Sequence, residues 1–133
     1  MMNAPRRLYL QPLASGTALA IYALERDGRC EVIEALRSLG EESYSQYSST
    51  RNMILHIAEH GFHSPQSWYR RIRGWRDQWE IRKGDHRFLG FVDGDSLVLC
   101  IHRRKRRQKL AEEDFARVDS LRKEWLHESR TRP

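Results

Sequence analysis

Residues 78–103, QWEIRKGDHRFLGFVDGDSLVLCIHR, decide the fold. They contain three runs that are rich in aromatic and β-branched or other apolar residues, and these runs are 78–83, 86–92 and 96–103. Each break between two runs carries an Asp beside a Gly, and an Asp-Gly pair between apolar runs is a strong signal for a hairpin turn. The stretch therefore predicts an antiparallel meander of three strands.

Upstream of the meander, the sequence predicts one strand and a pair of helices. Residues 19–24, LAIYAL, are a short apolar run that ends near an Asp-Gly turn signal, as strands commonly do. Apolar residues at helical spacing then predict a helix over 31–39, with Gly40 as its C-cap, and a second helix over 42–59. We expect these two helices to form an αα-hairpin.

Downstream of the meander, apolar residues recur at helical spacing over 111–128, and three acidic residues crowd the first turn, where the helix dipole favours anions. The complete order is strand, two helices, three strands and a helix. This order predicts an α+β fold, in which an antiparallel-rich sheet carries the helical hairpin on one face and is followed by a C-terminal helix.

The chain has 133 residues, which is a usual length for one compact domain, and we place that domain at residues 19–128. Residues 1–18 are assigned to an N-terminal extension, and residues 129–133 to a frayed tail. Two segments leave alternatives open. Residues 8–10 are either a strand or an ordered lead-in, and residues 68–73 are either a short helical turn or an irregular link.

Positive charge is concentrated in the second half of the chain. The net charge is +6, to which residues 67–133 contribute +7 and residues 1–66 contribute −1. A clustered basic surface gains affinity for polyanions by displacing their counterions, which predicts a nucleic-acid partner. The alternative is a basic surface that serves solubility alone.

The sequence has no apolar run long enough to span a bilayer and no signal-peptide pattern, so we expect a cytoplasmic protein without a membrane partner. Cys30 and Cys100 show neither CxxC nor zinc-finger spacing. We expect two reduced thiols, no metal and no cofactor.

The densest basic stretch is residues 103–109, with six cations in seven positions between the last strand and the last helix. A folded unit fixes the directions of these side chains, so we predict that they bind nucleic-acid phosphates; a solvated charge run is the alternative. The predicted nucleic-acid-binding residues, for which the family resemblance given below implies RNA, are Arg103, Arg104, Arg106, Arg107, Lys109, Arg73 and Arg76.

Two further arginines flank the first tight turn of the meander. Arg82 ends one predicted strand and Arg87 begins the next, so we expect their side chains to lie within reach of one another. An arginine can fork onto a phosphate with two hydrogen bonds. The alternative is that Arg82 pairs with Glu80 or Asp85.

Two histidines lie close to these cations in the sequence. His102 is at the end of the last predicted strand, beside the basic run, and His86 lies between the two arginines of the turn. Neighbouring cations disfavour the charged form of an imidazole, so we expect a neutral ring that can accept a proton.

Three motifs in the meander, taken in their order and spacing, resemble the phage-derived HigB-like branch of the RelE/ParE toxin superfamily. That branch reads roughly LWELR, YRxLYF and IVLLHxFxKK where this chain reads QWEIR from residue 78, HRFLGF from residue 86 and LVLCIHRRK from residue 97. The resemblance covers about residues 19–126. Three positions depart from the pattern, and these are His86 and His102, which replace aromatic residues, and Cys100, which replaces a common His.

The resemblance implies a RelE-like fold and a toxin of a type II toxin–antitoxin pair. Such toxins are typically ribosome-dependent mRNA endonucleases, and a helix-turn-helix antitoxin neutralises them. The implied partners are therefore the cognate antitoxin, through which the toxin oligomerises, the ribosome and mRNA. Two alternatives stay open: a ParE-like toxin that binds gyrase, and a module of the same fold that binds nucleic acid without catalysis.

The resemblance also implies a chemistry without metal, in which the 2′-OH of the RNA attacks the adjacent phosphate. This reaction needs a proton acceptor and donor, together with cations that stabilise the charge on the phosphate. We expect Arg82, Arg87 and Lys105 to hold the phosphate, with help from Arg104. The proton would be transferred by His102 or Glu80. The predicted catalytic residues are Arg82, Arg87, His102, Lys105 and Glu80.

Overall fold

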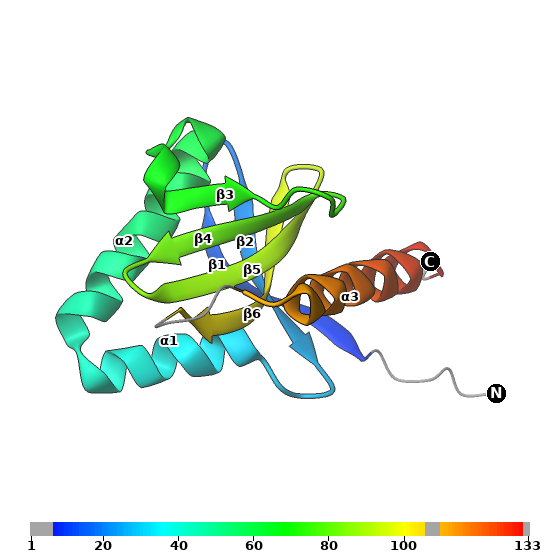
Figure 1. The fold of residues 1–133 in the computed structure, drawn as a ribbon, viewed down its shortest axis with the longest axis horizontal. Helices are drawn as coiled ribbons and strands as arrows, with labels where there is room; N and C mark the ends of the chain where they lie inside the picture. The colour runs from blue at the N-terminus through cyan, green and yellow to red at the C-terminus, as the bar shows by residue number, and fades with distance from the viewer. Residues whose placement is uncertain (1–6, 106–109, 132–133) are drawn as a thin grey trace.

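A computed structural model describes residues 7–105 and 110–131, with side chains through residue 129. Within these ranges the protein has an α+β fold, in which a six-stranded mixed sheet carries three α-helices (Figure 1). In chain order the elements are β1 (Leu8–Ser15), β2 (Ala20–Arg26), α1 (Glu31–Glu42), α2 (Tyr44–His60), the 3-10 turns η1 (Gly61–His63) and η2 (Gln66–Trp68), β3 (Tyr69–Arg71), β4 (Gln78–Lys83), β5 (His86–Asp93), β6 (Ser96–Arg104) and α3 (Glu112–Thr131). The strands lie side by side in the order β1-β2-β6-β5-β4-β3.

The predicted antiparallel meander is confirmed as β4, β5 and β6. Its first turn is tight, since Lys83 and His86 are directly paired across it. Gly84 makes this possible with a φ of 57°, a left-handed conformation that glycine adopts without a steric penalty. The turn sets Arg82 opposite Arg87, as the sequence predicts.

The pairing of β5 with β6 contains a β-bulge. Leu89 pairs with Ile101, but the next residue of β5, Gly90, pairs with Leu99, so Cys100 is the extra residue on β6. A Cβ atom on Gly90 would lie 2.0 Å from a backbone carbonyl oxygen of β6, and glycine is therefore required at this close approach.

The rest of the sheet is built from β1, β2 and β3. β1 pairs antiparallel with β2, and β2 runs parallel to β6 over residues 20–23. Of the two alternatives for residues 8–10, the strand is confirmed, and Leu8 is fully buried. Residues 8–15, which the sequence places in an N-terminal extension, thus form an edge strand of the sheet.

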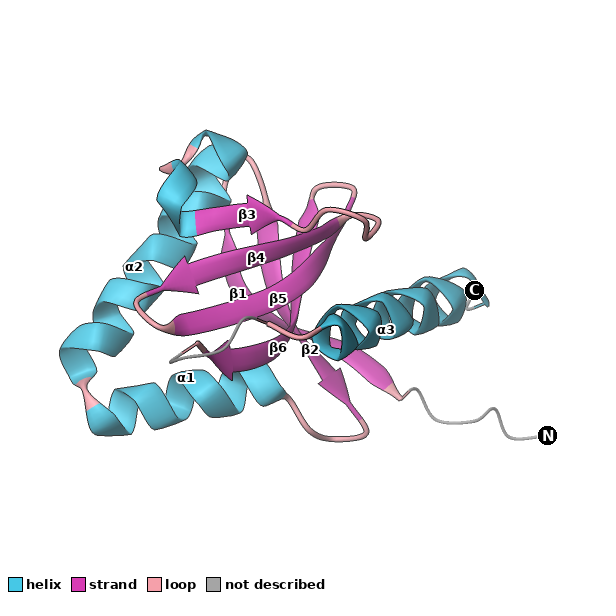
Figure 2. Ribbon diagram, viewed as in Figure 1, coloured by secondary structure: helices cyan, strands magenta, loops and turns pink. Residues whose placement is uncertain are grey.

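Helices cover both faces of the sheet (Figure 2). One face packs on α1 and α2 through residues that include Ile21 and Leu97, and we call it the α1–α2 face. The other packs on α3 through residues that include Phe91 and Val98, and we call it the α3 face. This arrangement explains why β6 carries apolar residues at successive positions, because a strand that is buried on both sides loses the alternating pattern.

Three local predictions differ from the structure. Helix α1 continues past Gly40, and the break falls at Ser43, whose hydroxyl accepts a hydrogen bond of 3.3 Å from the backbone N–H of Gln46 at the start of α2. The segment 68–73 contains the strand β3, which at three residues is too short to show a period in the sequence. Helix α3 extends to Thr131, so the first part of the predicted frayed tail is helical.

Candidate functional site

Three arginines surround one carboxylate on the α3 face, near the β4–β5 turn. Glu80 and Arg82 share this face because they are two residues apart on β4. Arg70 of β3 is directly opposite Glu80, and Arg87 of β5 is directly opposite Arg82. The distances from the Glu80 carboxylate are 3.1 Å to Nη2 of Arg70, 3.4 Å to Nε of Arg87 and 3.7 Å to Nε of Arg82. We call these four residues the arginine cluster.

Burial in the arginine cluster is graded from its centre to the β3 edge. The side chain of Glu80 is 2% exposed, and those of Arg87, Arg82 and Arg70 are 13%, 31% and 51% exposed. A carboxylate that is removed from water needs cationic partners to stay ionised, and three are present. After one charge is neutralised, the cluster keeps a net positive charge at the rim of the sheet.

Backbone carbonyl groups hold two of the arginines in place. Nη1 of Arg87 donates to the carbonyls of Gly84 and His86 at 2.7 and 3.0 Å. Nη2 of Arg82 is 3.5 Å from the carbonyls of Gln66 and Tyr69. The Nε atoms of both arginines are buried and donate no hydrogen bond to another described residue. These two guanidinium groups are therefore oriented before any ligand arrives.

The two histidines that the sequence singles out lie on the opposite face of the sheet. His102 pairs with Phe88, whose side chain belongs to the core of the α1–α2 face. The His86 and His102 rings contact one another, with 2.8 Å between Nδ1 of His86 and Nε2 of His102. Burial lowers the pKa of His86, and it lowers the pKa of His102 to about 4. The pair is neutral at pH 7, with one ring donating and the other accepting.

The surroundings of the histidine pair are acidic. A pocket of about 300 Å³ adjoins the pair and is lined by Glu31, Glu34 and Glu42 together with Arg104. The sheet lies between the histidine pair and the arginine cluster, because His102 and Phe88 face the α1–α2 side. The structure thus brings together Glu80, Arg82 and Arg87, and it does not bring His102 to them.

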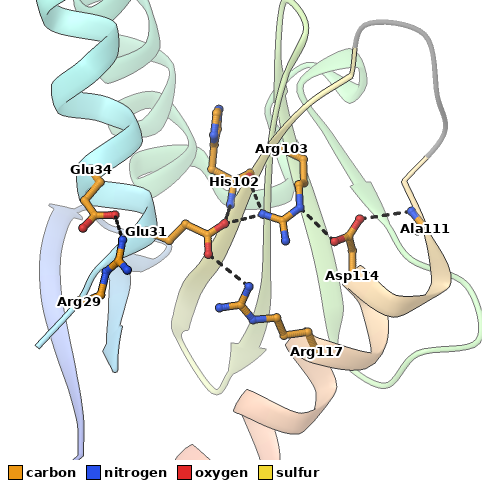
Figure 3. A network of polar contacts seen from close by, with 8 residues as sticks. All are labelled: Arg29, Glu31, Glu34, His102, Arg103, Ala111, Asp114 and Arg117. Carbon is orange, nitrogen blue, oxygen red and sulfur yellow. Dashed lines mark hydrogen bonds and ion pairs between the residues drawn. The ribbon is translucent and has the colours of Figure 1, made fainter. Parts of the chain in front are cut away.

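Arg103, the first cation of the basic run, is held by two carboxylates in a network that joins α1 and α3 (Figure 3). Its guanidinium lies 2.5 Å from Glu31 and 3.0 Å from Asp114. Glu31 also contacts Arg117 at 3.5 Å and accepts a hydrogen bond of 3.2 Å from the backbone N–H of His102. Arg103, predicted to bind RNA, is therefore part of the contact between helices.

The next cations of the run lie at the β4–β5 end of the sheet. Arg104 pairs with Asp85 at 3.0 Å, on the α1–α2 face. Lys105 is exposed, and its backbone N–H donates to the Asp85 carbonyl at 2.6 Å. Three other predicted RNA-binding residues lie outside the described residues, and these are Arg106, Arg107 and Lys109.

Arg73 and Arg76 are exposed near the start of β4, in the segment that joins it to β3. Arg76 lies 3.7 Å from its neighbour Asp77. The length of β4 separates these arginines from the β4–β5 turn, which at about 3.3 Å per residue amounts to roughly 20 Å. The structure does not bring them into the arginine cluster.

Arg70 is the member of the cluster that the sequence analysis missed. Its place depends on β3, which was not predicted. The available signal was the pattern of residues 68–71, two aromatics followed by two arginines, in which Arg70 and Arg71 would point to opposite faces of a strand.

Comparison with protein-family profiles, with curated proteins and with solved structures finds no significant match to this chain. In the part of the chain that the structure describes, no helix is long and apolar enough to cross a membrane. No group of three or more His, Cys, Asp or Glu side chains is placed to hold a metal ion among those same residues, and Cys30 and Cys100 are buried free thiols.

Proposed function

We propose that this chain is a RelE/HigB-type toxin, which binds mRNA at the arginine cluster and cleaves it on the ribosome. The observation that carries the proposal is the convergence of three arginines on a buried carboxylate, with a net positive charge left at the sheet rim. Three of the four residues, Glu80, Arg82 and Arg87, are those to which the motif resemblance assigns the site.

The order of elements supports this proposal. The resemblance implies a strand, a helical hairpin, a three-stranded meander and a C-terminal helix, and β2, α1–α2, β4–β6 and α3 follow that order. A shared order of elements does not by itself define an activity, because one fold supports many. The site residues are therefore the stronger support.

In the proposed reaction, the ribose 2′-OH attacks the adjacent phosphorus and the bond to the 5′ oxygen breaks. The products are a 2′,3′-cyclic phosphate end and a 5′-OH end. Arg82 and Arg87 bind the non-bridging oxygens, where charge grows in the transition state. Lys105, exposed next to the β4–β5 turn, adds a further cation from the end of β6.

Proton transfer is assigned to Glu80 in this proposal. Glu80 accepts the 2′-OH proton as a general base and then, as a general acid, donates that proton to the leaving 5′ oxygen. His102 was the other candidate, but it lies across the sheet with its ring against His86. We therefore do not give His102 a part in the chemistry.

The proposed partners follow from the same family resemblance. A helix-turn-helix antitoxin with an acidic segment would cover the basic surface, and toxin and antitoxin would purify together from the cytoplasm. A neighbouring reading frame that encodes such a protein would support the pair.

The test is translation in vitro with the purified chain, followed by mapping of mRNA 3′ ends. The expected result is cleavage within the ribosome-bound message, which Arg87→Ala abolishes and Arg71→Ala retains. Arg71 is a matched control because it is exposed on β3 and pairs with Trp79, whose side chain lies on the α1–α2 face. Intact messages with the unaltered chain would rule out the nuclease.

A second candidate is an RNA-binding module of this fold without catalysis. The burial of Glu80 favours this candidate. Its carboxylate already contacts three arginines, and it must lose one of these contacts before it can accept a proton from RNA. This candidate predicts strong, salt-dependent RNA binding without new 3′ ends. The same mapping experiment, with a binding assay beside it, separates the two.

A further inference from the structure

The arginine cluster carries more positive charge than one internal RNA phosphate can neutralise. Three guanidinium groups face one carboxylate, and no second carboxylate contacts them among the described residues, so the net charge is +2. An internal phosphodiester has a single negative charge, whereas a phosphate monoester carries about −1.5 to −2 at pH 7. We propose that the arginine cluster, besides holding an internal phosphodiester during cleavage, binds a dianionic phosphate, the terminal phosphate of an RNA strand, in competition with it, with Arg70 as the outermost ligand.

Backbone carbonyl groups orient the inner part of this site. Arg87 donates to the carbonyls of Gly84 and His86. Arg82 lies 3.5 Å from two carbonyls, that of Gln66 in η2 and that of Tyr69 in β3. Arginines that are already oriented lose less conformational entropy when an anion binds. Glu80, almost fully buried between them, fixes their spacing and prevents the mutual repulsion of three cations from spreading the cluster.

Access to the site is from the side of β3. Exposure increases from Arg87 through Arg82 to Arg70, so a ligand meets Arg70 first. Arg70 contacts Glu80 through Nη2, and its other guanidinium nitrogens have no partner among the described residues. Because β3 is an edge strand of the sheet, the end of an RNA can enter here without passing over another β-strand.

The next residue supplies a control of identical chemistry. Arg71 is also an exposed arginine of β3, but it pairs with Trp79, while Arg70 pairs with Glu80. Successive residues of a strand point to opposite faces, so Arg71 lies away from the cluster. Replacing either arginine removes the same charge from the chain, and a specific site responds to one replacement alone.

The experiment titrates the full chain at pH 8 with two small probes that differ in charge, inorganic phosphate and dimethyl phosphate. Binding is followed by NMR on the arginine Nε–Hε groups. We expect phosphate to bind at least tenfold more tightly than dimethyl phosphate. Arg70→Met should weaken phosphate binding about tenfold, which is one charge-assisted contact, and Arg71→Met less than about twofold. Arg70→Lys should fall between the unaltered chain and Arg70→Met, since it keeps the charge without the fork.

A second arm decides whether the phosphate belongs to RNA. Short oligoribonucleotides with a 5′-phosphate, a 3′-phosphate or no terminal phosphate are compared, with free phosphate as competitor. Tighter binding of either phosphorylated strand, by tenfold or more over the unphosphorylated one, supports the inference. Equal binding of the two small probes, no binding of phosphate, or equal effects of Arg70→Met and Arg71→Met overturn it.

The inference rests on the proposed function in its choice of RNA as the ligand, and the two can fail separately. If messages stay intact during translation but the dianion preference and the Arg70 effect hold, the nuclease fails and the phosphate site stands. If messages are cut but phosphate and dimethyl phosphate bind alike, the nuclease stands and the dianion site fails. Unfolding curves of Arg70→Met and Arg71→Met show whether either variant acts through folding.

Discussion

The two faces of the sheet hold two polar clusters of opposite character. On the α3 face, the arginine cluster is cationic and reaches the surface along β3. On the α1–α2 face, the buried His86 and the partly buried His102 form a neutral pair beside three glutamates of α1. His86 and Arg87 are adjacent in the sequence, but His86 belongs to the histidine pair on one face and Arg87 to the arginine cluster on the other. Closeness in the sequence is thus a poor guide to a shared site when the residues lie on a strand.

The largest expected effect concerns the charge at the centre of the arginine cluster. Glu80→Gln leaves three guanidinium groups without their buried counter-charge, and we expect the free energy of unfolding to fall by about 3 kcal/mol. Glu34→Gln, which removes an exposed pair with Arg29 at 3.4 Å, should cost less than about 0.5 kcal/mol. Chemical denaturation of both variants measures the difference. Similar small losses for the two would mean that the arginines do not depend on Glu80.

The next effect separates the faces by function. Arg87→Ala should reduce RNA cleavage by about 100-fold or more, the usual result of removing a donor to the developing charge. His102→Ala should change cleavage by less than about threefold, because its ring faces away from the proposed site. Single-turnover cleavage on programmed ribosomes is the measurement. An equal loss in the two variants, with folding intact, would place His102 in the site and contradict the separation of the faces.

A smaller effect is expected from acidification. The pKa of His102 is about 4 in the folded protein, below its usual value near 6.5, because the ring is buried. The unfolded chain therefore binds more protons between these values, and stability should fall as the pH is lowered from 6.5 towards 4. Denaturation midpoints at pH 7 and pH 5 test this. The decrease should be smaller in His102→Gln and unchanged in His63→Gln, which alters an exposed histidine of η1.

The smallest effect belongs to the ion pairs at the helix starts. Arg117→Met removes one exposed contact of 3.5 Å with Glu31, and we expect a loss below about 0.5 kcal/mol. Arg103→Met removes contacts to two carboxylates and should cost about 1 kcal/mol or more. Thermal unfolding of the two variants ranks these contributions. A larger loss for Arg117→Met would place the main connection of the network at Arg117.

The separation of His102 from Arg87 was not predictable from turn lengths. Counting back one-to-one from the pair of Asp93 and Ser96 at the second turn would set Arg87 opposite His102, on one face. The bulge at Gly90 adds one residue to β6, so Arg87 is paired with Arg103 instead. A shift of one residue moves every later side chain of the strand to the other face.

The meander and the shared face of Glu80 and Arg82 were predictable, because strand runs, Asp-Gly turns and the alternation within one strand are local features. The third arginine of the cluster was not. Arg70 reaches Glu80 through β3, whose three residues are fixed by pairing with β4 and not by a pattern of their own. The site was therefore predicted where it depends on one hairpin and missed where it depends on a tertiary edge.

The contact between Glu31 and the backbone of His102 bears on self-association. β2 and β6 are paired only over residues 20–23 and 96–99 within the described chain, so the later part of β6 lacks a strand on that side. An open strand edge is a template on which another chain can add a strand and begin to aggregate. Glu31 occupies the N–H of His102 with a carboxylate, and it brings a negative charge to the position that an incoming strand would need. A helix side chain thus protects the interior edge of the sheet, as inward-pointing charges and covering loops protect outer edges in other proteins.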